Sequence, residues 1–225
     1  MIKLEKVTKF YKDAGRLVFA INELDLEIKK GDFVAIVGPS GAGKTTLLSL
    51  VGCLIKPSAG NIRVNGYNTA DLNDNELSEL RAKKVGFVFQ GSHVIPNLTV
   101  LENVLLPLVF SKAKDLEAKK QRAGALLKEL GLGDRVNSLP QNMSGGQVKR
   151  ISIARALING PEVLLADEPT GELDQETSQD IIRILKKLNR EDGITILLVT
   201  HNQELAQNAK AIVKLRGGRL EENQC

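Results

Sequence analysis

The stretch FVAIVGPSGAGKTTLLSLV, residues 33–51, joins two apolar runs through a turn that contains three glycines. The first run is continuous and predicts a buried strand, and the second has the composition of a buried helix. Between them GPSGAGKT, residues 38–45, has the spacing G-x-x-x-x-G-K-[ST] of a loop that binds phosphate groups. A strand, a glycine-rich loop and a helix in this order predict an α/β fold.

The chemistry expected of this loop depends on its backbone and on a few side chains. Glycines let the chain wrap closely around phosphate groups, and N–H groups at the start of the helix stabilise their charge. We expect Lys44 to reach the β- and γ-phosphates of ATP, the Thr45 hydroxyl to bind Mg²⁺ and Thr46 to touch the α-phosphate. A glycine-rich turn without function is the alternative, and the flanking strand and helix argue against it. The residues expected to contact the nucleotide here are Gly38, Pro39, Ser40, Gly41, Ala42, Gly43, Lys44, Thr45 and Thr46.

The composition is that of an ordinary globular protein, since 42% of the 225 residues are hydrophobic and 26% are charged. The net charge of +4 comes from charges interleaved along the chain, so we expect no nucleic-acid partner. The N-terminus lacks the apolar core of a signal peptide, and the apolar windows are shorter than the roughly 18–20 residues of a spanning helix. Cys53 and Cys225 are the two cysteines, which excludes a disulfide framework and fits a reducing cytoplasm.

The hydrophobic periodicity divides the chain into two kinds of region. Strand patterns, some alternating with helical ones, occupy residues 1–90 and 160–225, whereas helical periodicity dominates residues 91–159. We therefore predict one domain over 1–225, with a core lobe from about 1–90 and 160–225 and a helical lobe at about 91–159. Within that lobe VLLPLVF, residues 104–110, fits either lobe core or a contact with a partner.

A second apolar strand pattern ends in two carboxylates. EVLLADEP, residues 162–169, predicts a buried parallel strand, and ligands gather at the carboxyl ends of such strands. Asp167 is suited to the Mg²⁺ shell, and Glu168 to polarising a water in line with the γ-phosphate. A strand that runs into an acidic turn is common, so this interpretation depends on the phosphate loop.

Three further residues are candidates for the same nucleotide. His201 ends another apolar strand, where the choice is between a surface histidine and a hydrogen bond to the γ-phosphate. Gln90 closes the strand pattern VGFVFQ and could touch Mg²⁺ or the attacking water. Tyr11 follows the first strand, and its ring could pack in the core or, as we favour, stack on adenine.

A second glycine-bearing turn, NMSGGQVKR at residues 142–150, gives the pattern its specificity. The phosphate loop, Gln90, MSGGQ, LLADEP, GELD at residues 171–174 and His201 follow one another in the order found in a known family. Along essentially its whole length the chain resembles the nucleotide-binding subunits of ABC transporters. The resemblance implies the P-loop ABC-ATPase fold, with a RecA-like parallel-sheet core, an antiparallel β subdomain and an inserted helical subdomain.

The same resemblance explains why one chain has two anion-binding turns. In that family two subunits pack head to tail, and each ATP lies between the phosphate loop of one copy and the signature turn of the other. It implies that Ser144, Gly145, Gly146 and Gln147 meet the γ-phosphate of ATP held by Lys44 of a second copy. Asp174 is then expected at the same seam, where it couples the two sites.

The chain looks most like the branch that includes lipoprotein-release, macrolide-efflux and antimicrobial-peptide-resistance ATPases. It departs from the common pattern at Met143, where leucine is usual, at Lys149, where glutamine is frequent, and at Asn202, where aspartate is usual. Met for Leu is nearly neutral in volume. We expect the other two to tune the rate rather than abolish activity. The sequence also predicts neither a C-terminal regulatory domain nor a second cassette.

The expected activity is Mg-dependent ATP hydrolysis by a dimer that drives integral membrane subunits, in export, extraction or mechanotransmission. The protein would be cytoplasmic and peripheral on the inner face of the membrane, with residues 90–96 near the docking surface for a membrane subunit. Two alternatives stay open. One is an ATP-driven regulatory switch on a membrane complex, and the other is a nucleotide-binding scaffold without turnover, which the presence of Glu168 and His201 weakens.

Overall fold

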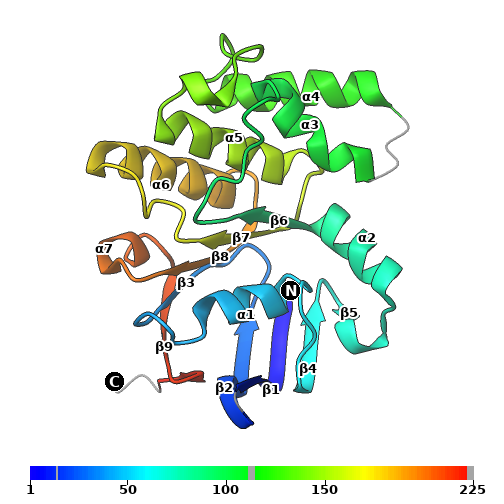
Figure 1. Ribbon diagram of the computed structural model, residues 1–225, viewed down its shortest axis with the longest axis vertical. Helices are drawn as coiled ribbons and strands as arrows, with labels where there is room; N and C mark the ends of the chain where they lie inside the picture. Colours follow the sequence, from blue (N-terminus) through cyan, green and yellow to red (C-terminus); the bar gives the residue numbers. More distant parts are fainter. Residues whose placement is uncertain (14, 111–114, 222–225) are drawn as a thin grey trace.

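The computed structural model describes residues 1–13, 15–110 and 115–221, and its strands form two sheets (Figure 1). The larger sheet has the strand order β10-β9-β3-β8-β7-β6. Its strands from β9 to β6 are parallel, and β10 pairs antiparallel with β9. The bounds are β3 Phe33–Val37, β6 Val85–Val88, β7 Val163–Asp167, β8 Thr195–Thr200, β9 Ala211–Arg216 and β10 Arg219–Leu220.

Both faces of this sheet are covered, because alternate residues of its central strands enter two different hydrophobic clusters. Ala35 of β3 packs in the cluster of α5 and α6, whereas Ile36 packs in the cluster of α1 and the smaller sheet. Figure 1 shows α1 on one side of the sheet and α5 and α6 on the other. These helices span α1 Lys44–Val51, α5 Gly145–Leu157 and α6 Gln175–Arg190.

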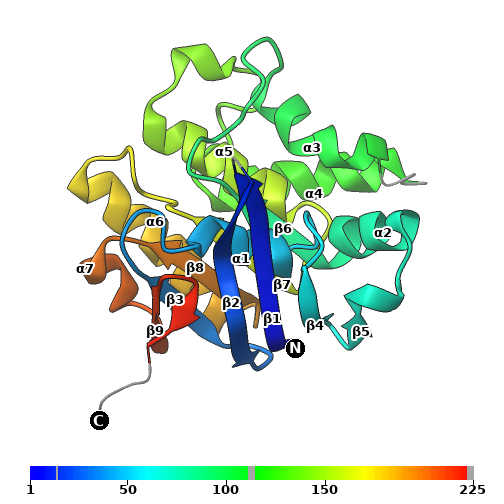
Figure 2. The ribbon, with the colours of Figure 1, turned by 60° about the horizontal axis from the view of Figure 1, so that its bottom comes forward.

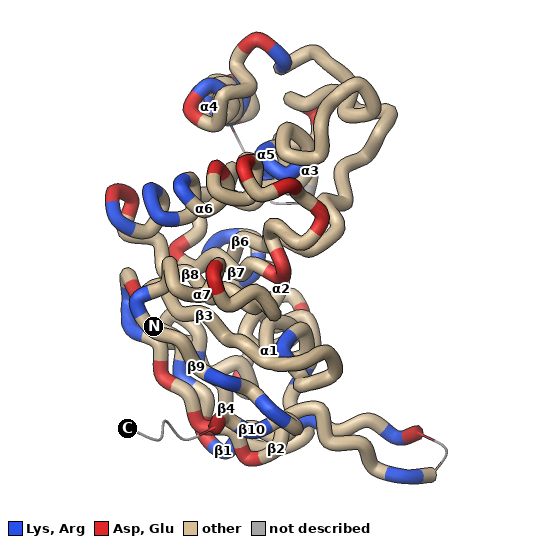
Figure 3. The backbone as a smooth tube through the Cα atoms, turned by 90° about the vertical axis from the view of Figure 1, so that its left-hand side faces the viewer, with Lys and Arg blue, Asp and Glu red and all other residues tan. Residues whose placement is uncertain are grey.

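The smaller sheet is antiparallel, with the order β2-β1-β4-β5. Its two long strands, β1 and β2, run side by side as a hairpin (Figure 2). Figure 3 shows this hairpin extending away from the body of the protein, with charged residues near its tip. Exposed Leu17, Val18 and Phe19 lie on this hairpin, and the rings of Phe10 and Phe19 are 5.8 Å apart. The strands span β1 Ile2–Asp13, β2 Arg16–Ile28, β4 Ala59–Val64 and β5 Tyr67–Asn68.

Helices α3, α4 and α5 lie together on the far side of the larger sheet from the smaller one (Figure 1). The VLLPLVF stretch belongs to α3 and serves two purposes, because Val104 and Leu108 are buried while Leu106 and Pro107 line a surface groove. The limits of a helical lobe at about 91–159 stay a prediction. The remaining helices are α2 Asp74–Lys84, α3 Val100–Phe110, α4 Leu116–Glu129 and α7 Gln203–Ala206, with 3₁₀ turns at Thr69–Asp71 and Pro140–Asn142.

The predicted parallel sheet, antiparallel sheet and helical segment are confirmed, with two differences at strand and helix ends. β6 ends at Val88, so Gln90 lies in the loop after the strand instead of closing it. The sequence NQELAQNAK, residues 202–210, predicts a helix, and α7 covers only Gln203–Ala206 of it. Within the described ranges, none of the helices combines the length and the apolar character needed to cross a membrane.

Asn103 holds the loop that leads from the larger sheet to α3. Its side chain is fully buried, its Oδ1 accepts from the Ile95 N–H at 2.7 Å, and its Nδ2 lies 3.0 Å from each of three carbonyl oxygens. Those carbonyls belong to Ile95, Leu98 and Thr99. A buried backbone group without a partner is costly, so this one amide fixes the whole turn.

Replacing Asn103 by alanine is expected to lower the free energy of unfolding by about 2 kcal/mol, because the backbone groups of the loop before α3 lose the buried amide that binds them. Urea unfolding monitored by circular dichroism measures the change. The matched control is Asn75→Ala, an exposed asparagine of α2, for which we expect a change within about 0.5 kcal/mol. Equal stability of both variants would contradict the assignment.

Candidate nucleotide site

The phosphate loop follows β3, and close approaches of its backbone to neighbouring strands fix its shape. A Cβ on Gly43 would lie 2.1 Å from the Ala20 carbonyl oxygen of β2, and the φ of Gly43 is 101°. A Cβ on Gly38 would lie 2.2 Å from the Leu215 carbonyl oxygen of β9. Only glycine fits either position. The sequence motif predicts glycines that approach phosphate, and here two of them are also required by packing within the protein.

Helix α1 begins directly at this loop without a side-chain cap. Gly43 is its N-cap and offers no side-chain acceptor, so the first N–H groups of the helix point toward the loop. Lys44 is half-buried, and its Nζ donates to the carbonyls of Gly38 at 2.8 Å and Pro39 at 3.0 Å. The loop therefore combines free backbone donors with a positive charge held at its mouth, as an anion site requires.

The Thr45 hydroxyl donates to Asp167 Oδ2 at 3.0 Å, which joins the loop to the end of β7. Burial raises the pKa of Asp167 above its usual value and the Glu168 charge adds to this, while the Thr45 hydrogen bond and the Lys44 charge oppose it. Hydroxyl and carboxylate oxygens are ligands that Mg²⁺ accepts while keeping water and phosphate in its other positions. Thr45 and Asp167 are therefore candidate Mg²⁺ ligands. Among the described residues there is no group of three or more His, Cys, Asp and Glu side chains that could hold a metal.

Glu168 follows Asp167 and is held by the neighbouring strand β8. It is 8% exposed and has a φ of 42°, in the left-handed region that side chains other than glycine rarely adopt. Its Oε1 accepts from the His201 N–H at 2.8 Å and lies 2.7 Å from the ring Nδ1 of His201. Its Oε2 accepts from the Thr200 hydroxyl at 2.8 Å. The two residues predicted from separate strand ends thus contact each other directly.

Thr200 is the residue of this site that the sequence analysis missed. It is fully buried at the end of β8, where it donates to Glu168 and accepts from the Asn202 N–H at 3.0 Å. The usable signal is a hydroxyl at the carboxyl end of a strand whose four middle residues are all apolar. Asn202 in turn caps α7, since its Oδ1 accepts from the Leu205 N–H at 3.2 Å. Asparagine caps helices as well as aspartate does, so Asn202 can replace the aspartate that is usual at this position.

The side-chain amide of Gln90 lies near the turn that follows Glu168. A Cβ built on Gly171 would be 3.8 Å from Gln90 Nε2 and 3.6 Å from Glu168 Cβ, so the amide reaches the turn that follows β7. The side chain is exposed, as a residue that meets a ligand would be.

Tyr11 lies on β1 opposite Val18 and is 46% exposed, so it is not a core residue. Lys9 Nζ lies 5.5 Å from the ring centroid, in cation–π range. The same hairpin carries Ala20, whose carbonyl contacts the phosphate loop. Stacking of the ring on adenine stays a prediction.

The signature turn lies at the N-terminus of α5, on the face of the sheet opposite α1. Ser144 caps the helix through a reciprocal pair of bonds with Gln147, at 3.0 and 3.3 Å. A Cβ on Gly146 would lie 2.2 Å from Thr177 Cγ2 of α6, so glycine allows the two helices to meet. Within the described residues, no hydrogen bond or ion pair joins Ser144–Gln147 to the phosphate loop.

Asp174 caps the neighbouring helix α6. It accepts from the Thr177 N–H at 2.9 Å and from the Thr177 hydroxyl at 2.6 Å, and these two bonds lower the pKa of its carboxyl. A role across a subunit seam stays a prediction, but the side chain is exposed beside the signature turn. Met143, the residue before the cap, packs against the hydrophobic core as leucine would.

The cysteines play no visible part in this site. Cys53 is buried at the end of α1, and burial raises the pKa of its thiol to about 11. Cys225 lies outside the described residues.

Comparison with known proteins agrees with this arrangement. The sequence model of the ABC transporter family matches residues 21–171, more than half of the chain. The chain belongs to the ABC transporter family. Members of this family are ATPases, and the ABC-ATPase fold expected from the resemblance is confirmed.

Two kinds of relative show where this ABC protein is placed in the family. It is 47% identical to the ABC transporter ATP-binding protein MJ0796 of Methanocaldococcus jannaschii, over 100% of this chain and 97% of that protein. It is 45% identical to the macrolide export ATP-binding/permease protein MacB of Rhodopseudomonas palustris, over 96% of this chain and 33% of that protein. The chain thus spans about a third of MacB, and this match agrees with the branch suggested by the sequence.

Solved ABC structures are similar over nearly the whole chain. MJ0796 in a dimeric post-hydrolysis state with ADP and Pi has a TM-score of 0.90 at 45% identity, with 99% of this chain and 97% of that chain covered. CbiO1 from Clostridium perfringens, part of the ABC transporter complex cbiONQ, has a TM-score of 0.87 at 27% identity, with 98% and 86% covered.

Replacing Thr200 by valine is expected to lower kcat about tenfold, because Glu168 loses a hydrogen bond worth roughly 1–2 kcal/mol. Binding of a fluorescent ATP analogue should change less than about twofold. Steady-state ATPase and binding assays measure both quantities. The matched control is Thr195→Val, a fully buried threonine at the other end of β8 that accepts from the Gly31 N–H. An equal loss of kcat in both variants would show a general effect on the strand.

Proposed function

We propose that the protein is a Mg-dependent ATPase that dimerises on two ATP molecules and drives an integral membrane partner. The observation that carries the proposal is the chain of contacts Thr45–Asp167 and Glu168–His201, with Lys44 at the mouth of the adjoining loop. The phosphate loop, the two proposed metal ligands and the carboxylate proposed to orient water therefore lie at one end of the sheet. Phosphoryl transfer needs positioning and charge neutralisation more than covalent chemistry, and this arrangement provides both.

Each residue has a proposed role in that reaction. Backbone N–H groups of the loop and Lys44 bind the phosphates, while Thr45 and Asp167, with Gln90, would hold Mg²⁺, which neutralises phosphate charge. Glu168 orients the attacking water, held in place by Thr200 and His201, and His201 also hydrogen-bonds the γ-phosphate. Tyr11 stacks on the adenine.

The site is completed by a second copy of the chain. Ser144 is exposed and is the N-cap of α5, a helix N-terminus that favours an anion. It lies on the other face of the sheet from α1. The solved structures of MJ0796 are dimeric, which supports a dimer of this chain. We propose that Ser144, Gly145, Gly146 and Gln147 close on the γ-phosphate held by the partner, with Asp174 at the seam.

The membrane partner docks in a groove beside the Gln90 loop. The groove measures about 640 Å³ and is largely apolar, and the stacked rings of Phe87 and Phe89 lie along it with centroids 5.4 Å apart. Leu54 is 48% exposed at its edge. Such a patch is typical of an interaction site. The predicted segment 90–96 does not itself line this groove. It lies beside the groove next to Phe89 and Arg155, which do line it. Association with a membrane subunit would place the protein at the inner face of the membrane.

Replacing Glu168 by glutamine is expected to lower kcat by about 100-fold or more, because the water loses its acceptor, while ATP still binds. Size-exclusion chromatography with ATP should then show a stable dimer, and with ADP a monomer. Glu162→Gln, at the start of the same strand, is the control and should behave like the unsubstituted protein. A monomer with ATP would count against both the dimer and the role of Glu168.

Mixing two inactive variants tests whether the site is shared. Lys44→Ala removes the phosphate ligand and Ser144→Arg blocks the signature turn, so each variant alone should be inactive. A mixed dimer contains one intact site, and ATPase activity should reappear on mixing. The control is each variant at the total protein concentration of the mixture. Activity of Ser144→Arg alone equal to that of the unsubstituted protein would show that the turn is not part of the site.

A charge in the groove tests the docking surface. Leu54→Asp should abolish co-purification of the membrane partner from detergent extracts, since an apolar contact cannot accommodate a buried carboxylate. Leu17→Asp, equally exposed on the β1–β2 hairpin, should retain it. Retention by both variants would place the partner elsewhere.

A further inference from the structure

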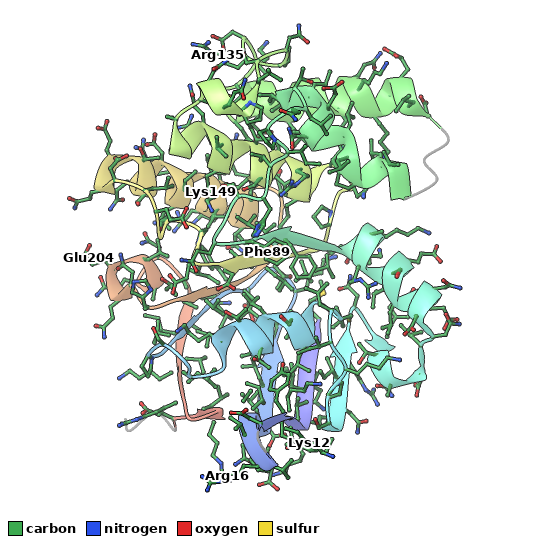
Figure 4. The ribbon with its side chains drawn as sticks, viewed as in Figure 1. Lys12, Arg16, Phe89, Arg135, Lys149 and Glu204 are labelled. Carbon is green, nitrogen blue, oxygen red and sulfur yellow. The ribbon has the colours of Figure 1, made fainter. Side chains whose placement is uncertain are left out.

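The loop after β6 is fastened to the helices by side chains, and Lys149 makes the first of these attachments. Lys149 lies on α5 and is 3% exposed. Its Nζ donates to the carbonyl of Phe89 at 2.9 Å and to the carbonyl of Gln90 at 2.6 Å. Figure 4 shows Lys149 on the side of α5 that faces the end of β6, near Phe89.

The next attachment comes from the same helix. The Arg155 guanidinium donates to the carbonyls of Ser92 at 2.8 Å and His93 at 2.7 Å. Two cationic side chains of α5 therefore bind four backbone carbonyls of residues 89–93. Since β6 ends at Val88, this part of the chain has left the sheet and follows α5 instead.

A buried ammonium is an unusual choice for such a contact. Burial lowers the pKa of Lys149, and the charge of Glu172 opposes that shift. A charge out of water is costly unless its donors are used, and here two carbonyls receive them. The Lys149 ammonium thereby forms a short, charge-assisted hydrogen bond to the backbone of Gln90, whose side-chain amide reaches the turn after Glu168.

We propose that Lys149 is a positioning residue for Gln90: by binding the Phe89 and Gln90 carbonyls, it sets the direction of the Gln90 side chain toward the reacting phosphate. The proposal deepens the proposed function, because it rests on the role given there to Gln90. A lysine ammonium carries three donors, so a shorter neutral side chain replaces it only in part.

The test is a double-mutant cycle of Lys149→Met and Gln90→Ala, with kcat, KM for ATP and the Mg²⁺ concentration for half-maximal rate as readouts. Lys149→Met alone should lower kcat by about tenfold or more, since a small misplacement of a positioned group can cost up to about 100-fold. KM for ATP should change less than about twofold, and more Mg²⁺ should be needed. In the Gln90→Ala background, Lys149→Met should have no further effect.

Two variants calibrate the result. Lys149→Gln keeps amide donors and should recover part of the activity lost in Lys149→Met. Lys128→Met removes an exposed lysine of α4 and should match the unsubstituted protein. An equal fall of kcat in the presence and in the absence of Gln90, or no fall at all, would overturn the positioning role.

A readout without catalysis separates this proposal from the proposed function. The probe is a nitroxide attached to Ser92→Cys, in a background with Cys53→Ala and Cys225→Ser. Its electron paramagnetic resonance lines should become sharper in the Lys149→Met variant, because the loop is released. If the unsubstituted protein hydrolyses no ATP, the proposed function fails, and the spectra still report whether Lys149 holds the loop. An unchanged spectrum in Lys149→Met would overturn the attachment itself.

Discussion

The in-register pairing of β3, β8 and β7 is the constraint on which the site depends. Val37 lies opposite Thr200, and Val199 lies opposite Asp167, so three strands reach the same edge of the sheet together. The residues that follow each strand are therefore neighbours although they are far apart in the sequence. Burial on both faces keeps this register, because a slip by one residue would exchange the two hydrophobic clusters.

Three buried polar side chains, those of Asn103, Lys149 and Thr200, hold loop backbone or a site carboxylate near this edge. Asn103 and Lys149 bind carbonyls of the loop after β6, and Thr200 binds Glu168. Asn103 and Lys149 satisfy backbone groups that a strand or helix would otherwise pair, which is how a segment without regular structure stays ordered. The core thus supplies rigidity in its strands and places polar side chains where the strands end.

Much of the fold could be predicted from the sequence because its signals are local. The apolar run before Gly38, the motif at Lys44 and the acidic strand end at Asp167 each specify their own structure. The rest depends on contacts between distant segments, such as the Ala20 carbonyl that requires glycine at position 43. Lys149 was recognised as unusual, yet no pattern in the sequence indicated that its ammonium reaches the backbone of Gln90.

The contact between Gly146 and Thr177 has a consequence for how two copies meet. It brings the starts of α5 and α6 close together, so that Ser144 and Asp174, the N-caps of the two helices, lie on neighbouring helix ends. If a second copy meets this surface, as we propose, association needs little ordering of flexible segments, which leaves more of the contact energy available to close the interface. A methyl group at position 146 would push the starts of α5 and α6 apart. The surface offered to a second copy would then change shape.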